Sequence, residues 1–381
     1  MQSIILRTLV GGALVIGSLS SSAQTDKINV VTSAVPFLRI SPDARAGGMG
    51  DLGVATSPDV NSQFYNVAKY PFASTKSGIA MTYTPWLKDL GLTDVYLTTL
   101  SGFHKIDEQQ SISGSLRYFS LGNIQFTDNF GNDLQMVRPR EFAIDAGYAR
   151  KLSDELSLGV AVRYINSNLA GNSSINGISY KAGTTVAGDL GLYYNRPAAD
   201  GSGLSLGLAM TNLGAKIGYT DDAAAKDFIP ANLAIGAVYT KVVNEVNKVS
   251  FGLDIHKMMV PTPPALGDSA GLINYRSKGV VGSWFSSFGD ASGGFAEELR
   301  EFSFSSGMEY LYNDQFAFRL GYFYEDKTKG NRQYFSMGAG IRYNVFGINF
   351  SYLIPSGTGV NRNPLSNTMR FSLVFDLDGD E

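Results

Sequence analysis

The segment LSLGVAVRYINSNL, residues 156–169, is the clearest indication of the fold class, because its apolar side chains alternate with small or polar ones. In an extended strand, one face carries Leu158, Val160, Val162 and Tyr164, and the other carries Ser157, Ala161 and Arg163. A soluble sheet buries its apolar face, whereas a transmembrane strand turns that face to lipid. Arg163 then faces a lumen, where it avoids the roughly 2–4 kcal/mol that an arginine facing lipid costs at the midplane.

Further segments repeat this alternation between turn residues, and fourteen strands are predicted in all. They are 77–87, 93–106, 110–121, 141–152, 156–169, 183–196, 203–214, 228–241, 248–258, 303–312, 316–325, 333–344, 347–354 and 367–377. Short turns alternate with long loops at 122–140, 170–182, 215–227, 259–302 and 355–366. We therefore predict an all-β transmembrane fold, a 14-stranded antiparallel outer-membrane β-barrel over 77–381, with both termini periplasmic and the long loops extracellular.

The composition agrees with a barrel. The chain has 43 Gly, 23 Phe and 20 Tyr with only 17% charged residues, and barrels use aromatic girdles at both membrane interfaces. No window offers eighteen uninterrupted apolar residues, so a membrane would have to be crossed by strands. The absence of Cys excludes disulfides and thiolate sites, and a net charge of −3 gives no footprint for nucleic acid. A large soluble β-sandwich is the alternative, which the loop alternation disfavours.

The N-terminus predicts export. Arg7 precedes an apolar stretch from Leu9 to Leu19, and Ser21-Ser22-Ala23 provides small residues for cleavage, so 1–23 is expected to be a signal peptide. Residues 24–76 do not alternate and contain several prolines and glycines, yet they are too apolar for a disordered tail. We predict that this segment is a plug folded into the barrel lumen.

Charged residues of the plug are expected to pair with charges that face the lumen. Arg39, Asp43, Arg45 and Asp51 are the plug candidates. The strand alternation places Arg117, Arg163, Asp254, Glu309, Arg319, Arg342 and Arg370 inside, together with Asp145 and Asp189. The prediction is a polar lumen network of mixed sign.

Two patterns suggest catalysis or cofactor binding, and both are weak. Residues 48–53, GMGDLG, match the dinucleotide pattern G-x-G-x-x-G, but no βαβ unit surrounds them. Ser250, Asp254 and His256 share one strand face and suggest a lipid hydrolase, but residues two apart on a strand are ~7 Å apart and no oxyanion motif is visible. The only other histidine, His104, has no metal-site partner at helical spacing. We predict no enzymatic function, no metal and no cofactor.

The loop at 259–302 is the most informative connection, because loops of this length are functional or disordered. It carries the aromatic residues Trp284, Phe285, Phe288 and Phe295. An aromatic cluster in an outer loop indicates either a contact surface for a protein partner, where Trp and Phe are enriched, or a lid over the lumen mouth. The sequence leaves both alternatives open.

Several stretches resemble the PorV family of the type IX secretion system, which belongs to the superfamily of FadL-type transporters. The resemblance rests on Phe37 to Tyr70, on DIHKMMVPTPP from Asp254 to Pro264, on Ser306 to Asp326, and on Gly330 to Tyr352. It covers most of the mature chain and implies a fourteen-stranded barrel with an N-terminal plug.

The resemblance also implies a function. Proteins of this family are thought to bind the C-terminal sorting domain of secreted cargo as it leaves a large translocon barrel of the SprA or Sov type. They pass the cargo to a PorU-type sortase attachment complex, which links it to surface lipopolysaccharide. The alternative is a FadL-like channel for long-chain fatty acids or other hydrophobic small molecules. The lumen arginines argue for a sealed interior, although a pocket at the outer mouth alone would escape that objection.

Overall fold

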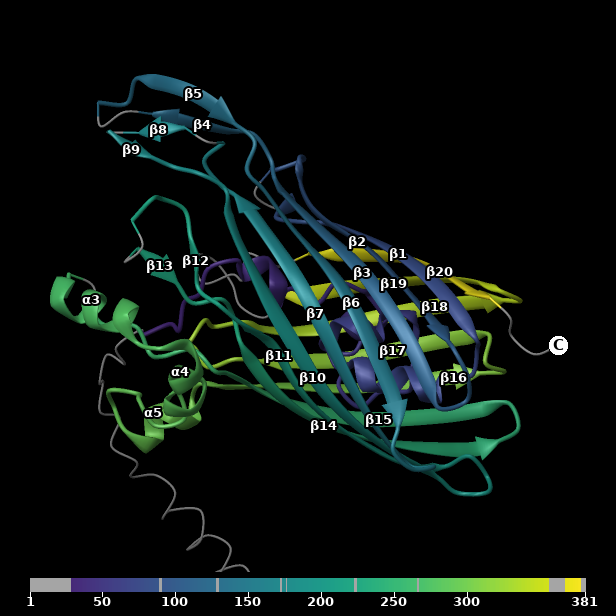
Figure 1. The fold of residues 1–381 in the computed structure, drawn as a ribbon. Helices are drawn as coiled ribbons and strands as arrows, with labels where there is room; N and C mark the ends of the chain where they lie inside the picture. The colour runs from purple at the N-terminus through teal and green to yellow at the C-terminus, as the bar shows by residue number, and fades with distance from the viewer. Residues whose placement is uncertain are drawn as a thin grey trace, which may run out of the picture.

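The computed structural model describes residues 29–88, 91–127, 130–171, 173–175, 177–222, 225–265, 267–355 and 367–377. The predicted signal peptide at 1–23 and nearly all of the loop predicted at 355–366 lie outside these residues. Figure 1 shows a single barrel of tilted strands, with short turns at one end and long connections at the other. We call these the short-turn end and the long-loop end. Among the described residues, no helix is long and apolar enough to cross a membrane.

The barrel wall has fourteen antiparallel strands, and β1 closes the ring by pairing with β20. The strands are β1 Ser77–Pro85, β2 Val95–Lys105, β3 Gln110–Leu121, β6 Arg140–Lys151, β7 Leu156–Asn168, β10 Gly183–Pro197, β11 Gly203–Gly214, β14 Asn232–Asn244, β15 Asn247–Met258, β16 Phe302–Tyr312, β17 Phe316–Tyr324, β18 Gln333–Tyr343, β19 Phe346–Pro355 and β20 Met369–Leu377. The predicted strand count and barrel are confirmed, with strand ends displaced by a few residues.

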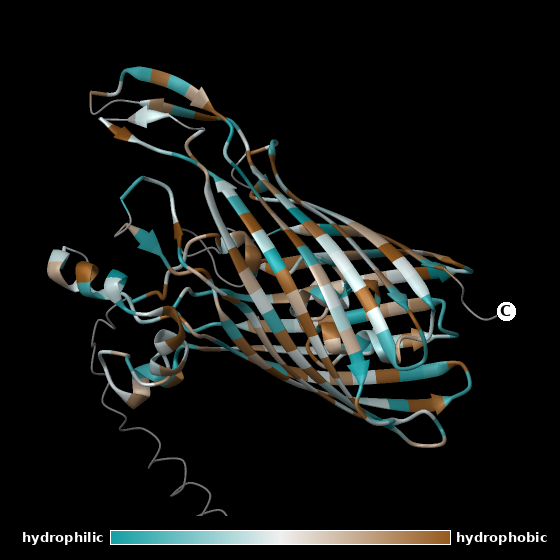
Figure 2. Ribbon diagram, viewed as in Figure 1, coloured by the Kyte–Doolittle hydropathy of each residue, from teal (hydrophilic) through white to brown (hydrophobic). Residues whose placement is uncertain are grey.

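The alternation in the sequence becomes alternation between the outside and the inside of the wall. On β7, Val160 and Val162 are exposed on the outer surface, whereas Ser157 and Arg163 are buried inside. Figure 2 shows the resulting bands of apolar and polar residues along each strand. An outward apolar surface is the one that a bilayer covers, because lipid replaces the buried core of a soluble sheet.

The two ends of the barrel differ in their connections. The turn between β16 and β17 places Asn313 and Asp314 in the left-handed region, at φ 53° and 50°, which suits a tight turn between twisted strands. The long loops contain the hairpins β4 Ile124–Thr127 with β5 Asp133–Val137, β8 Ser174–Ile175 with β9 Ile178–Ser179, and β12 Ile217–Gly218 with β13 Lys226–Asp227. The loop after β15 forms the helices α3 Ser269–Ser277, α4 Val280–Ser286 and α5 Phe295–Leu299. The strand alternation predicts none of these loop elements.

We call residues 29–76 the plug segment; from Val35 onward they lie inside the barrel (Figure 1). It contains η1 Pro36–Arg39, α2 Ala44–Gly47, η2 Val60–Phe64 and η3 Val67–Phe72. Side chains of Asp43, Asp59 and Asn66 accept backbone hydrogen bonds at the starts of the last three, which is how such short helices satisfy their free N–H groups. Helix α2 packs on β18, β19 and β20, and η3 packs on β6, β7 and β10.

The described chain begins and ends at opposite ends of the barrel. The backbone N–H of Asn29 donates to the carbonyl of Thr328, which lies in the long-loop connection between β17 and β18. Leu377 pairs with Ser77 at the short-turn end. Residues 29 and 377 therefore lie at opposite ends of the barrel, because the plug segment runs through the lumen. The prediction that both termini are periplasmic concerns terminal residues that lie outside the described ones.

Candidate functional site

Arg163 lies at the centre of a buried charge cluster in the wall facing the plug. It forms ion pairs with Asp145 on β6 and with Asp189 on β10, the latter at 2.9 Å between Nη2 and Oδ2. Asp145 also accepts a hydrogen bond from Ser115, and Asp189 accepts one from the backbone N–H of Asn212 at a bulge between β10 and β11. The cluster therefore joins five strands, β3, β6, β7, β10 and β11, and leaves few polar atoms unpaired.

Glu309 on β16 binds the plug to the wall. Arg45 of helix α2 donates to both carboxylate oxygens of Glu309, at 3.0 and 2.7 Å, and Arg319 on β17 donates to the same carboxylate at 2.6 Å. Arg45 also reaches Asp59 within the plug, at 2.7 Å. A bidentate arginine of this kind fixes orientation as well as charge.

Asp254 and Asp51 make the next two connections between plug and wall. The Asp254 carboxylate accepts the backbone N–H groups of Gly53 and Val54, at 2.8 and 2.9 Å. Asp51 accepts a hydrogen bond from Tyr334 at 2.6 Å and forms an ion pair with Arg370 at 3.3 Å. Of the four plug candidates, Arg39, Arg45 and Asp51 thus form ion pairs with charges of the barrel, whereas Asp43 bonds within the plug to Tyr65.

Arg117 contacts the plug, whereas Arg342 lies at the short-turn end of the barrel. Arg117 is buried, donates to the carbonyl of Leu38 at 3.0 Å and stacks over the Phe64 ring, so it holds the plug without a direct carboxylate partner. Arg342 also faces the lumen, as predicted, but at its short-turn mouth. Its side chain is 44% exposed, pairs with Asp376 and lines the cavity there, because β18 ends one residue later.

The arrangement argues against the hydrolase hypothesis. The Asp254 carboxylate caps the plug backbone, and the Ser250 hydroxyl bonds Thr240 at 2.9 Å. The described residues therefore bring together no nucleophile, base and acid from Ser250, Asp254 and His256. Among the same residues, no group of three His, Asp or Glu side chains could hold a metal ion.

Glycines allow the plug backbone to approach the wall closely. A Cβ at Gly321 on β17 would lie 2.6 Å from Met49 Cα, and one at Gly307 on β16 would lie 2.6 Å from the Met49 carbonyl oxygen. Gly48 and Gly338 meet in the same way, with about 3 Å between an added Cβ and the facing Cα. The glycine-rich run at 48–53 therefore serves backbone-to-wall contact and does not cradle a nucleotide.

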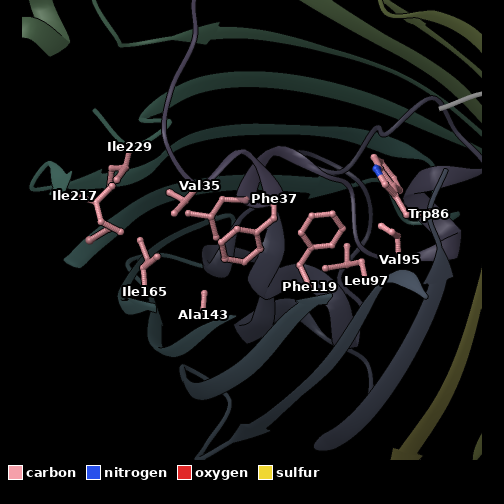
Figure 3. Packing of buried hydrophobic residues seen from close by; sticks show 12 residues of the cluster. Val35, Phe37, Trp86, Val95, Leu97, Phe119, Ala143, Ile165, Ile217 and Ile229 are labelled. Atoms are coloured by element: carbon pink, nitrogen blue, oxygen red, sulfur yellow. The ribbon is translucent and has the colours of Figure 1, made fainter. Parts of the chain in front are cut away.

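An apolar cluster fills the lumen towards the long-loop end (Figure 3). Phe37 of the plug is fully buried and stacks parallel to Phe119 on β3, with ring centroids 6.4 Å apart. Val35 and Leu38 of the plug pack on the same cluster, which also includes Trp86, Leu97, Ile165 and Ile217. Beyond the plug, at the short-turn end, lies a cavity of about 690 Å³ with charged walls that include Arg45, Glu309 and Asp376.

The loop at 259–302 is fastened to the barrel by buried charges that the alternation pattern does not predict. Lys257 at the end of β15 pairs with Glu298 at 2.7 Å and also with Glu301. Lys329, in the connection between β17 and β18, reaches Glu297 at 2.6 Å and Glu301 at 2.9 Å. In the sequence, this contact is indicated only by the acidic run Glu297-Glu298-Leu299-Arg300-Glu301.

Another charge group holds the plug at the long-loop end. Glu325 accepts hydrogen bonds from Arg39 of the plug, at 3.1 Å, and from Arg332, at 2.7 and 2.8 Å. Burial alone would raise the pKa of Glu325, but the guanidinium groups of Arg332 and Arg39 outweigh it and hold that pKa below its ordinary value.

The four aromatic residues singled out in the loop are not buried against the barrel. Phe285 and Phe295 are 70% and 78% exposed, Phe288 is 40% exposed, and Trp284 is half-buried. Further exposed apolar side chains on α3, α4 and α5 are Leu272, Ile273, Val281 and Leu299. We call these eight residues the loop surface.

Comparisons with known proteins agree on the fold and the family. The Ralstonia pickettii toluene transporter TbuX is 13% identical with a TM-score of 0.52, over 87% of this chain and 97% of that chain. The CymD monoaromatic hydrocarbon channel is 12% identical with a TM-score of 0.52, over 88% and 97%. These likenesses show the barrel fold alone, and no curated protein sequence matches the chain. The family described as type IX secretion system protein PorV matches residues 22–265, more than half of the chain. The chain therefore belongs to the PorV family of outer-membrane proteins.

Proposed function

We propose that this outer-membrane protein binds secreted cargo at the C-terminal sorting domain as the cargo leaves a large translocon barrel of the SprA or Sov type. It then passes the cargo to a PorU-type attachment complex at the lipopolysaccharide surface. In this proposal the long loops face the cell exterior and the barrel is a membrane anchor with no catalytic function. Membership of the PorV family supports a role in type IX secretion, and the loop surface supports protein binding.

The observation that carries the proposal is the exposure of apolar side chains on α3, α4 and α5. A lid would turn Phe285 and Phe295 towards the lumen, yet both rings are more than two-thirds exposed. Burying a side chain of this size against a partner contributes about 1.5–3 kcal/mol. Large aromatic anchors of this kind dominate the energetics of protein interfaces. The loop surface therefore favours the contact-surface alternative over the lid.

The fastening of the loop adds to this argument. Lys257 and Lys329 bind the acidic end of the loop at Glu297, Glu298 and Glu301. Thr262 at its beginning donates to Asp290 at 2.9 Å. A surface that is already ordered loses less conformational entropy on binding, so it binds more tightly for the same contacts.

The FadL-like channel remains the alternative proposal, and the lumen argues against it. The apolar region where a hydrophobic molecule would be held is filled by Val35, Phe37 and Leu38 of the chain itself. The cavity at the short-turn end has charged walls and lies beyond the plug. A lipid path would need the plug to break its ion pairs with Glu309 and Arg370 and its backbone hydrogen bonds to Asp254.

A mild-detergent pull-down of the tagged protein from its native membrane tests the proposal. The loop variant Phe285→Ser/Phe288→Ser/Phe295→Ser should lose secreted proteins that retain their C-terminal domains. The matched control is Leu134→Ser/Met136→Ser on the β5 hairpin, where the side chains are 50% and 64% exposed, and it should retain them. The proposal would be contradicted if the unaltered protein, the loop variant and the control variant all recovered the same amount of secreted protein. Recovery of the barrel alone with bound fatty acid would also contradict it.

A further inference from the structure

The first described residues of the chain lie among the long loops. Besides its backbone bond to Thr328, Asn29 donates through its side chain to Glu297 in the loop at 259–302, at 3.4 Å. Val31 is buried in a cluster that contains Phe228, Met258, Val260 and Tyr275. The backbone N–H of Ala34 donates to the carbonyl of Phe228 at 2.8 Å. All these partners belong to the long-loop end of β14, β15 and β17 or to the loops beyond them.

From this end the plug segment crosses the lumen once. Arg39 pairs with Glu325 near the long-loop end, and Asp51 and Gly53 bind Arg370 and Asp254 further inside. Arg45 and Asp59 line the cavity at the short-turn end. The segment then enters β1 at Ser77, which pairs with Leu377 and His104 at the short-turn end.

The wall offers the segment no side exit. Strand β1 pairs along its length with β2 and over seven residues with β20, so the ring is closed where the segment joins it. Arg39, Arg45 and Asp51 hold the segment at three levels of the lumen by ion pairs with wall strands or their connections. The barrel therefore closes around a chain that enters at one mouth and leaves at the other.

With the orientation of the proposed function, in which the long loops face the cell exterior, we infer that residues 29–34 lie on the extracellular side of the outer membrane. The chain then passes through its own barrel and presents these residues outside the cell. These residues form one continuous outer surface with the loop at 259–302 and the connection at 325–332. The C-terminal strand ends on the periplasmic side. Between residues 29 and 377 the chain thus crosses the membrane an odd number of times, through fourteen strands and the plug segment.

Single-cysteine labelling tests this inference, because the protein has no Cys of its own. Thr32 is exposed at the long-loop end, and we choose it as the labelling position, Thr32→Cys. Asp133→Cys on β5 is the control for the long loops. Glu108→Cys, in the turn between β2 and β3 with a side chain 88% exposed, is the control for the short turns. Each variant is treated in intact cells with a membrane-impermeant maleimide, and again after the outer membrane has been permeabilised.

The inference predicts that Thr32→Cys is labelled in intact cells as strongly as Asp133→Cys, while Glu108→Cys is labelled only after permeabilisation. Labelling of Thr32→Cys only after permeabilisation, alongside Glu108→Cys, would overturn it. Labelling of Thr32→Cys only after unfolding would also overturn it, because the residue would then be enclosed. Ser33→Cys repeats the test should Thr32→Cys fail to assemble, and heat-modifiable migration on gels shows assembly of each variant.

Discussion

Replacing Arg163 by methionine should destabilise the barrel by about 3–5 kcal/mol, the typical effect of removing one partner from a buried ion pair. Arg163 is 2% exposed, and its two partners Asp145 and Asp189 are 3% and 6% exposed. Without the guanidinium, the carboxylates on β6 and β10, the strands on either side of β7, lose their ion-pair partner. Arg163→Met keeps most of the side-chain volume, so the loss reports charge and not packing.

The triple variant Arg163→Met/Asp145→Asn/Asp189→Asn should recover most of this loss, because replacing all members of a buried charge cluster by neutral groups is often close to neutral. The control is Lys181→Met, which removes a pair with Asp221 whose side chains are 54% and 85% exposed and should change stability by less than about 1 kcal/mol. Reversible urea unfolding in lipid vesicles, followed by the fluorescence of Trp86 and Trp284, gives each free energy of unfolding. If Arg163→Met matched Lys181→Met, or if the triple variant were no more stable than the single one, this reasoning would be refuted.

Four other predictions concern the plug and the loop. Gly321→Val should push Met49 and the plug away from β17 and produce ion conductance in planar bilayers, whereas Gly114→Val, whose Cβ would meet only the Asp145 carbonyl at 3.4 Å, should stay closed. Phe37→Ala should destabilise the protein by about 3–5 kcal/mol and admit an apolar fluorescent probe that the unaltered protein excludes; equal probe binding by both would contradict the filled cluster. Lys257→Met should leave Glu298 and Glu301 without this cation and speed proteolysis within 259–302, and unchanged cleavage rates would argue that the loop is held by other contacts. The pKa of Glu325 is lowered in the folded state, so its ion pairs stabilise the protein above the ordinary carboxyl pKa, and this stabilisation is lost as the pH falls through the pKa of the folded state. Glu325→Gln should therefore reduce the loss of stability at acid pH. An unchanged loss would contradict this role of Glu325.

The strand alternation predicts well which side of the barrel wall a side chain faces, because this depends only on its parity, the odd or even position of the residue within its strand. It places Arg163, Glu309 and Arg319 inside, where the structure has them buried. Parity does not give the depth of a residue along the barrel, so it does not predict that Arg342 lines the lumen at its short-turn mouth.

The plug and the loop contacts could not be predicted in the same way, because they depend on partners far apart in the chain. Arg45 and Glu309 are 264 residues apart, and no local pattern pairs them. Lys257 lies near the end of β15, and its partner Glu301 is 44 residues further along the chain, where the end of the loop returns to cover it. The direction in which the plug segment crosses the lumen is likewise set by Asn29 and its distant partners Thr328 and Glu297.

The most direct test of the proposed role is photocrosslinking from the loop surface in living cells. A photoreactive phenylalanine replaces Phe285, which is 70% exposed on α4, and in a parallel strain it replaces Met136 on β5, which is 64% exposed. After irradiation, the proposal predicts adducts at position 285 with secreted proteins that retain their C-terminal sorting domains, and few or none at position 136. Adducts with lipid alone at position 285, or the same cargo adducts at both positions, would contradict recognition of cargo by the loop surface.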